Sequence, residues 1–190
     1  KSARSVSSDR VGPAPMSGST AESTQGLRLL AAAEAGEDLG QRLEQLNEIG
    51  ASLSAERDIN RLLESILVAA KTITRADGGT LYLIENEGVS QQLRFEIVRT
   101  ASLDIAMGGT TGNPIPFYPI RLYTDSDPNT SMVAAFAALT GQTVNIADAY
   151  TEVGFDFSGT RQFDQKTGYR SKSFLTVPMR NHEGEIIGVL

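Results

Sequence analysis

The most constraining part of this chain changes from polar to apolar within a few residues. Its polar run, residues 163–173, carries the side-chain oxygens of Asp164, Thr167 and Ser171 at short spacing. Residues 174–179 are then almost wholly apolar. We interpret this order as a polar loop that leads into a buried strand. Such a loop suits the floor of a pocket that hydrogen-bonds a small polar ligand.

Residues 27–53, ahead of this stretch, are predicted to form a helix. Leu39, Leu43, Leu46 and Leu53 recur at spacings of four, three and seven residues, which is the a/d stripe of helices that pair. An amphipathic helix packed on its own domain has the same pattern. We favour the pairing helix because the stripe begins well before the domain core.

A second helix, Ile59–Ile73, follows with Asp58 as its N-cap. A short helix capped by Asn129 or Ser131 is predicted to end near residues 140–141. The predicted strands are 80–85, 94–100, 115–123, 143–146, 174–180 and 185–190. This order defines an α+β fold, with an antiparallel sheet of five or six strands, the N-terminal helices on one face and a pocket on the other.

Glycine and proline mark the irregular parts of the chain. Three prolines between positions 114 and 119 limit the strand there to a sheet edge. The glycine-rich segment 108–112 lacks the lysine of a phosphate-binding loop, so we predict a flexible connection. Residues 86–92 and 181–184 are predicted to connect the strands of two hairpins.

The residue types present exclude several functions. Cysteine is absent, which rules out disulfides, thiolate catalysis and covalent attachment of a pigment or other cofactor to a thiol. The only histidine, His182, lies in a predicted turn, so neither a transition-metal site nor a Ser-His-Asp triad is expected. The net charge of −6 argues against nucleic acid as a partner. Without an apolar run of roughly 18 residues, we expect no membrane span in this chain.

Three sequence blocks, in the right order, resemble a known family. They are Asp77–Ile84 (DGGTLYLI), Thr140–Tyr150 (TGQTVNIADAY) and Phe163–Met179 (FDQKTGYRSKSFLTVPM) followed by Glu185–Leu190 (EIIGVL). Together they resemble the GAF domains of cyclic-nucleotide phosphodiesterases and bacterial signalling proteins, over roughly residues 46–190. The variant Gly154–Arg161 is similar to GAF domains joined to HD-GYP phosphodiesterase or nucleotidyl cyclase modules.

The resemblance implies a GAF-like fold and a set of ligand-binding residues. Asp164, Thr167 and Ser171 match positions that contact the purine and the ribose–phosphate region in members that bind cyclic nucleotides. Val133 and Ala134 match helix-start positions whose backbone N–H groups face the cyclic phosphate, an arrangement that suits an anion. The remaining residues expected to line the pocket are Ser131, Phe157 and Thr160.

Four of these residues also have a purely structural interpretation. Asp164 is equally able to cap the turn at Thr167–Gly168, and Thr167 and Ser171 can bond the local backbone. Phe157, like its aromatic neighbours, is equally suited to fill the core beneath a long loop. The sequence alone leaves both interpretations open.

The resemblance implies a regulatory module that senses a small molecule, with a cyclic nucleotide as the first expectation. The module would control an attached bacterial output domain, best matched by an HD-GYP cyclic di-GMP phosphodiesterase. The alternative is a GAF module for dimerisation or signal transmission, with another ligand or none. We expect no enzymatic activity in this chain, because no nucleophile or catalytic base is visible, whereas the parent is expected to be a phosphodiesterase, a cyclase or a histidine kinase.

The chain is expected to divide into three parts. Residues 1–25 form a disordered tail or vector-derived residues, residues 26–54 the signalling or dimerisation helix, and residues 55–190 a GAF domain that lacks the end of its last strand and its C-terminal helix. We expect a cytoplasmic homodimer with a small-molecule ligand and no covalently attached cofactor.

Pairing of the 27–53 helix gives the first testable prediction. Each leucine removed from water contributes about 1.5–3 kcal/mol, so a dimer through this stripe is favoured. Replacing Leu39 and Leu43 together by Glu is expected to give a monomer, measured by light scattering at tens of micromolar. A monomeric wild-type chain would contradict the prediction, as would a variant that remains dimeric.

Overall fold

The structure is a computed structural model that describes residues 39–87 and 90–190. The predicted tail, the first part of the predicted N-terminal helix and two residues of the first hairpin turn lie outside the described residues. Residues 39–55 are helical, and Leu39, Leu43 and Leu46 are exposed there. The elements discussed below belong to the unit formed by residues 52–190. Pairing through the first helix stays a prediction.

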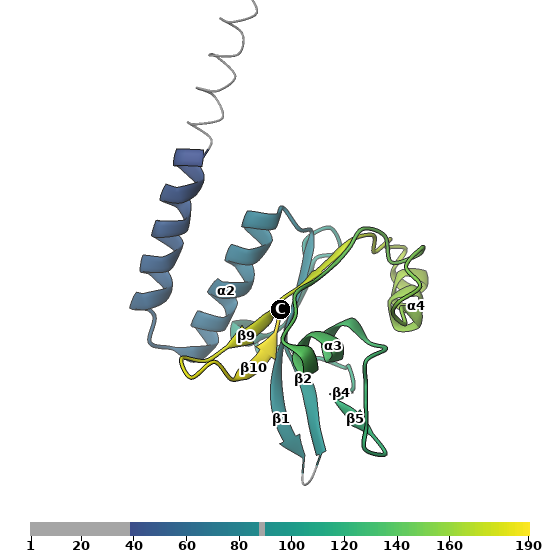
Figure 1. The fold of residues 1–190 in the computed structure, drawn as a ribbon. Coiled ribbons are helices and arrows are strands. Elements are labelled where there is room, and N and C mark those ends of the chain that lie inside the picture. The colour runs from purple at the N-terminus through teal and green to yellow at the C-terminus, as the bar shows by residue number, and fades with distance from the viewer. Residues whose placement is uncertain (1–38, 88–89) are drawn as a thin grey trace, which may run out of the picture. The chain divides into compact units, whose positions relative to one another are not determined.

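The elements of this unit are helices set between runs of consecutive strands (Figure 1). They are α2 (Ile59–Thr74), β1 (Gly78–Glu87), β2 (Ser90–Thr100), β3 (Ile105–Gly108), the 3₁₀ helix η1 (Gly109–Thr111), β4 (Ile120–Arg121), β5 (Tyr123–Thr124), β6 (Asp127–Pro128), α3 (Val133–Thr140), β7 (Val144–Ile146), α4 (Ser158–Thr167), β8 (Phe174–Thr176), β9 (Pro178–Arg180) and β10 (Ile186–Val189).

The central sheet has six strands, and its pairings are antiparallel. Its order is β3-β2-β1-β10-β9, and β4 adds to the outer edge of β2. The hairpin β5–β6 and the pair β7–β8 form two smaller ladders. The predicted α+β fold with an antiparallel sheet is therefore confirmed.

Helix α2 covers one face of the sheet. Its N-cap is Asp58, as predicted, with Oδ1 accepting from the backbone N–H of Asn60 (2.9 Å) and Arg61 (3.1 Å). Leu63 and Leu67 are buried in one cluster with two side chains of the sheet, Leu81 and Ile97. Burial of each such side chain contributes about 1.5–3 kcal/mol, so this cluster holds α2 in place.

Helix α3 covers the opposite face, as Figure 1 shows. Its small side chains let it approach closely, and Ala135, Ala137 and Ala138 pack with Leu93 and Val189. The prediction of a side-chain cap from Asn129 or Ser131 is wrong. The N-cap is Met132, whose side chain makes no capping hydrogen bond. The Oδ1 atom of Asn129 accepts from the Ser131 hydroxyl (3.1 Å) and from the backbone N–H of Met132 (3.4 Å), before the first turn of α3.

One extra residue in β2 divides its apolar side chains between the two faces. Leu81 lies opposite Ile97 and Tyr82 opposite Phe95, so Glu96 has no partner on β1 and forms a β-bulge. Ile97 packs with the α2 cluster, whereas Phe95 packs with the α3 cluster. Alternation alone would put Phe95 and Ile97 on the same face.

Several predicted boundaries need correction. The first hairpin pairs up to Glu87 and Ser90, so most of the predicted 86–92 loop is strand. The predicted strand 115–123 is wrong over most of its length, because its prolines lack the N–H that a ladder requires. Segment 108–112, predicted as a flexible connection, ends the unpredicted strand β3 and forms η1.

The polar loop predicted at residues 163–173 is also wrong in its first part. Residues 158–167 form α4, which places Phe157 and Asp164 on its buried side. Gly168 ends the helix in the left-handed conformation, with φ at 72°. The helix was missed because few of its residues are apolar, so it lacks a regular hydrophobic period.

A part-buried ion pair fixes α2 to the sheet. The Nε and Nη2 atoms of Arg99 each donate to a different carboxylate oxygen of Glu64 at 2.7 Å. Thr110 donates to Glu64 Oε2 through its backbone N–H (3.1 Å) and its hydroxyl (2.9 Å). Burial alone would raise the pKa of Glu64, but the bonds from Thr110 and Arg99 outweigh it and lower this pKa.

Glu64→Gln is expected to lower the free energy of unfolding by about 2–4 kcal/mol near neutral pH. Since the folded pKa lies below the unfolded value, the carboxylate stabilises the fold above about pH 4.3 and loses this contribution as the pH falls through the folded pKa. Urea unfolding across this pH range should show that the free energy of unfolding falls less on acidification in the variant than in the wild type. The exposed pair Glu85–Arg94 offers a control, because Glu85→Gln is expected to cost about 1 kcal/mol or less. Equal losses in both variants would contradict the prediction.

Candidate functional site

Asp164 is buried and bonded by its own chain. Its Oδ2 atom accepts from the Tyr150 hydroxyl (2.7 Å) and the Ser171 backbone N–H (2.8 Å), and its Oδ1 atom accepts from the Ser171 hydroxyl (2.8 Å). Only 4% of the residue is exposed. The carboxylate bonds Ser171 and Tyr150 and so ties α4 to the segment that leads into β8.

Tyr150 joins this buried carboxylate to two cationic side chains. The hydrogen bond to Asp164 is the main cause that raises the pKa of Tyr150 above its ordinary value. The guanidinium carbons of Arg170 and Arg161 lie 4.1 Å and 5.8 Å from the centre of its ring. The ring therefore sits between a buried anion and two surface cations.

The other α4 residues expected at the site have local or core roles here. The Thr167 hydroxyl donates to the Phe163 carbonyl (2.8 Å), and the residue is exposed. Phe157 is buried with Val133, and its ring centre lies 5.3 Å from that of Phe174. Thr160 is half-buried within α4.

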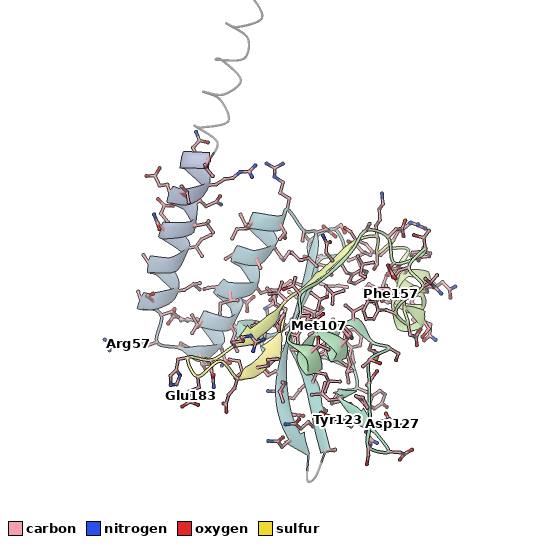
Figure 2. All side chains as sticks on the ribbon, in the orientation of Figure 1. Arg57, Met107, Tyr123, Asp127, Phe157 and Glu183 are labelled. Carbon is pink, nitrogen blue, oxygen red and sulfur yellow. The ribbon has the colours of Figure 1, made fainter. Side chains whose placement is uncertain are left out.

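The start of α3 lies beside a hollow of about 370 Å³ (the hairpin hollow). Of the predicted site residues, Ser131 lines it, and the structure brings it together with Met132, the N-cap of α3. The carboxylates of Asp127 and Asp156 lie there too, and Figure 2 labels Asp127 on the β5–β6 hairpin. Hydrogen bonds from Ser158 lower the pKa of Asp156 and so keep it charged. The lining residues are Thr124, Asp127, Pro128, Asn129, Thr130, Ser131, Met132 and Asp156.

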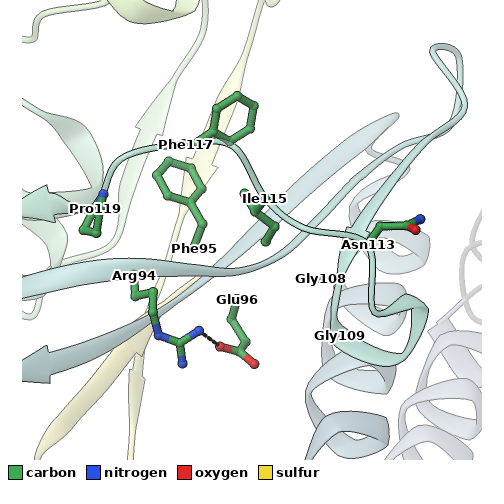
Figure 3. Close-up of a pocket in the computed structure, with 9 residues that line it drawn as sticks. All are labelled: Arg94, Phe95, Glu96, Gly108, Gly109, Asn113, Ile115, Phe117 and Pro119. Carbon is green, nitrogen blue, oxygen red and sulfur yellow. Dashed lines mark ion pairs between the residues drawn. The ribbon is translucent and has the colours of Figure 1, made fainter.

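A second hollow, of about 390 Å³, opens at the outer edge of β2 (the edge hollow; Figure 3). There β4 pairs with Gln92 and Leu93 and β3 pairs with 97–100, so these strands leave residues 94–96 unpaired on that edge. Segment 113–119 passes alongside. The lining residues are Arg94, Phe95, Glu96, Gly108, Gly109, Asn113, Ile115, Phe117 and Pro119.

The edge hollow combines an aromatic wall with an acidic one. The ring centres of Phe95 and Phe117 lie 5.3 Å apart, and Figure 3 shows them on the side of β2 opposite Arg94 and Glu96. Arg94 pairs with both Glu96 and Glu85, the latter at 2.8 Å, so the three side chains carry a net charge of −1. The Glu96 Oε2 atom is buried, and apart from this ion pair it has no hydrogen-bond donor.

The sequence interpretation missed the edge hollow. Arg94 and Glu96 alternate with apolar residues, which is the ordinary pattern of a strand with one solvent-facing side. The signal that was present is the row of prolines around Ile115 and Phe117, which prevents a strand from covering the edge of β2. Of the eight residues predicted to bind ligand, seven line neither of these two hollows.

Two negative findings apply to residues 39–87 and 90–190. Within them, no group of three or more histidine, cysteine, aspartate or glutamate side chains is placed to hold a metal ion. Among the helices of the same ranges, none is long and apolar enough to cross a membrane.

The comparisons with known proteins now identify the family. Residues 58–190 match the family described as GAF domain, so the chain belongs to the GAF domain family. Among curated relatives, the cGMP-specific 3′,5′-cyclic phosphodiesterases of Drosophila sechellia and Drosophila melanogaster are each 30% identical over 145 residues, which is 75% of this chain. The chain spans only 11% and 12% of the lengths of these two relatives.

Solved structures support the same fold. The GAF domain of a phosphoenolpyruvate-protein phosphotransferase from Coxiella burnetii has a TM-score of 0.54 and 14% identity, covering 77% of this chain and 73% of that one. The corresponding Acinetobacter domain has a TM-score of 0.52 and 14% identity, with coverage of 78% and 73%. At this identity the likeness shows the fold alone.

Asp164→Ala is expected to lower the free energy of unfolding by about 2–4 kcal/mol, because it leaves the donors of Ser171 and Tyr150 without their acceptor. Ser171→Ala removes only the hydroxyl donor and is expected to cost about 1 kcal/mol. Urea unfolding of both variants measures the difference. If Asp164→Ala costs no more than Ser171→Ala, the buried carboxylate does not stabilise this connection.

Proposed function

We propose that this chain is the sensor module of a signalling protein and binds a cyclic purine nucleotide, with cyclic GMP preferred. The curated relatives support the ligand class, because each is described as a cGMP-specific phosphodiesterase. The GAF domain is a regulatory fold and not the catalytic part of such an enzyme. The chain itself is therefore proposed to bind the nucleotide without transforming it.

The observation that carries the proposal is the Glu96 carboxylate in the edge hollow. Guanine presents two neighbouring N–H donors, N1–H and N2–H, which match the two oxygens of a carboxylate. Glu96 offers a carboxylate whose buried Oε2 atom is ion-paired with Arg94 and has no further hydrogen-bond donor, and the rings of Phe95 and Phe117 offer a surface for stacking. A planar base placed at the unpaired edge of β2 would contact both walls.

The start of α3 is the proposed contact for the cyclic phosphate. No side chain caps this helix, so the backbone N–H groups of Val133 and Ala134 are available to an anion. Phe95 and Ala134 pack against the same core cluster. The aromatic wall of the edge hollow and the start of α3 therefore lie on one face of the sheet. The charged carboxylate of Asp156 opposes an anion in the hairpin hollow. A phosphate bound there would therefore have to be held by these amides against the charge of Asp156.

The proposal for the parent protein and its assembly rests on the sequence resemblance and on the curated relatives. We propose a cytoplasmic homodimer whose attached output domain is an HD-GYP cyclic di-GMP phosphodiesterase, as the sequence variant at Gly154–Arg161 implies. The exposed leucines Leu39, Leu43 and Leu46 support the dimer. They equally support the second candidate function, a dimerisation module with another ligand or none. Reading the full coding sequence of the gene tests this assignment of the output domain.

Isothermal titration of the chain with cyclic GMP and cyclic AMP tests the proposed ligand. We expect tighter binding of cyclic GMP, and Glu96→Gln is expected to weaken it by about 1.5–3 kcal/mol while changing cyclic AMP affinity less. Glu85→Gln provides the matched control, since Glu85 also pairs with Arg94 but does not line the edge hollow. Absence of binding to the folded wild-type chain would overturn the ligand assignment. An equal effect of both variants would overturn the role of Glu96.

A further inference from the structure

The wall of the edge hollow is bonded directly to helix α2, which lies on the other face of the sheet from α3. Gly108 and Gly109 line the hollow, and the next residue, Thr110, donates twice to Glu64 of α2. Arg99 bridges the same parts: it donates to the carbonyls of Met107 (2.6 Å) and Gly108 (3.3 Å) and to both oxygens of Glu64. The wall and the helix thus share one hydrogen-bonded network.

The fit between Gly109 and Glu64 leaves no free space. A Cβ atom added to Gly109 would lie 2.5 Å from Glu64 Oε2. Leu63 and Leu67 hold α2 by apolar contact, which is not directional and tolerates small sliding or rotation. The bonds of Glu64 are directional and charge-assisted. A displacement of residues 108–110 is therefore transmitted to α2 chiefly through the hydrogen bonds of Glu64.

We propose that Glu64 is the positioning residue that couples the edge hollow to helix α2. The inference rests on the proposed function only in naming what fills the hollow. An occupant that presses on Gly108 and Gly109 moves Thr110 and Arg99, and both pull on the Glu64 carboxylate. An occupant at the sheet edge thereby changes the hydrogen bonds of the second turn of α2.

Two glycine variants test the coupling without any ligand. Gly109→Ala drives a methyl group to 2.5 Å from Glu64 Oε2 and to 3.1 Å from the Ile97 side chain. Gly112→Ala introduces the same group at a similarly positive φ, +68° against +55°, with nothing within 4 Å. Both variants carry backbone strain, and only the first touches Glu64. Hydrogen exchange of the α2 amides is expected to be about threefold or more faster in Gly109→Ala than in Gly112→Ala. Equal α2 exchange in the two folded variants would overturn the proposal.

If Gly109→Ala fails to fold, two less disruptive threonine variants test the same coupling. Thr110→Val removes the hydroxyl bond to Glu64, whereas Thr111→Val removes a hydroxyl bond to the Gly108 carbonyl and leaves Glu64 untouched. Faster exchange around position 64 only in Thr110→Val supports the coupling. Equal exchange in both contradicts it.

Adding cyclic GMP to the wild-type chain and to a Glu64→Met, Arg99→Met double variant tests the same link with an occupant. Replacing both partners of a buried ion pair by apolar residues commonly preserves folding. We expect the nucleotide to slow α2 exchange in the wild type and not in the double variant. A response that persists in the double variant overturns the coupling. Failure of the nucleotide to bind overturns the proposed ligand, while the glycine pair still decides the coupling.

Discussion

The one-residue bulge at Glu96 determines which side chains each face of the sheet presents. Without it, Leu93, Phe95 and Ile97 would all point to one face, because side chains alternate strictly along a strand. With it, Leu93 and Phe95 pack with the α3 cluster and Ile97 with the α2 cluster. Both helices therefore find apolar surface on a single hairpin, and the two cores depend on that extra residue.

The bulge also explains why a charged hollow exists at the sheet edge. At Glu96 β2 leaves regular pairing, and β3 and β4 pair only with the residues on either side of residues 94–96. The segment that passes this gap, 113–119, contains three prolines and cannot close it by forming a ladder. The carboxylate that the bulge brings there shares Arg94 with Glu85, which leaves a net negative charge beside an aromatic wall.

The sequence predicted those elements that carry a regular apolar period and a clear boundary signal. Helix α2 has both, with Leu63 and Leu67 on one side and Asp58 as its cap, and its predicted end, Ile73, lies one residue from the observed end. Helix α4 lacks the period, and strand β3 is only four residues long with Gly108 at its end, so both were missed. The edge hollow was unpredictable for a different reason. The run from Leu93 to Ile97 alternates perfectly, and nothing in it reveals that pairing with β1 skips Glu96.

Asp164, in the polar run 163–173, and the edge hollow differ in which existing bonds a ligand must displace. Both oxygens of Asp164 are already bonded by Ser171 and Tyr150, so a ligand that used them would first have to break bonds worth about 0.5–1.5 kcal/mol each. The buried Oε2 atom of Glu96 is paired with the Arg94 guanidinium and has no further donor, so a ligand N–H adds a charge-assisted bond but shares this oxygen with Arg94. In this structure Asp164 and Ser171 therefore hold α4 against the segment before β8. At the outer edge of β2, residues 94–96 are not paired by β3 or β4 and can bond a partner.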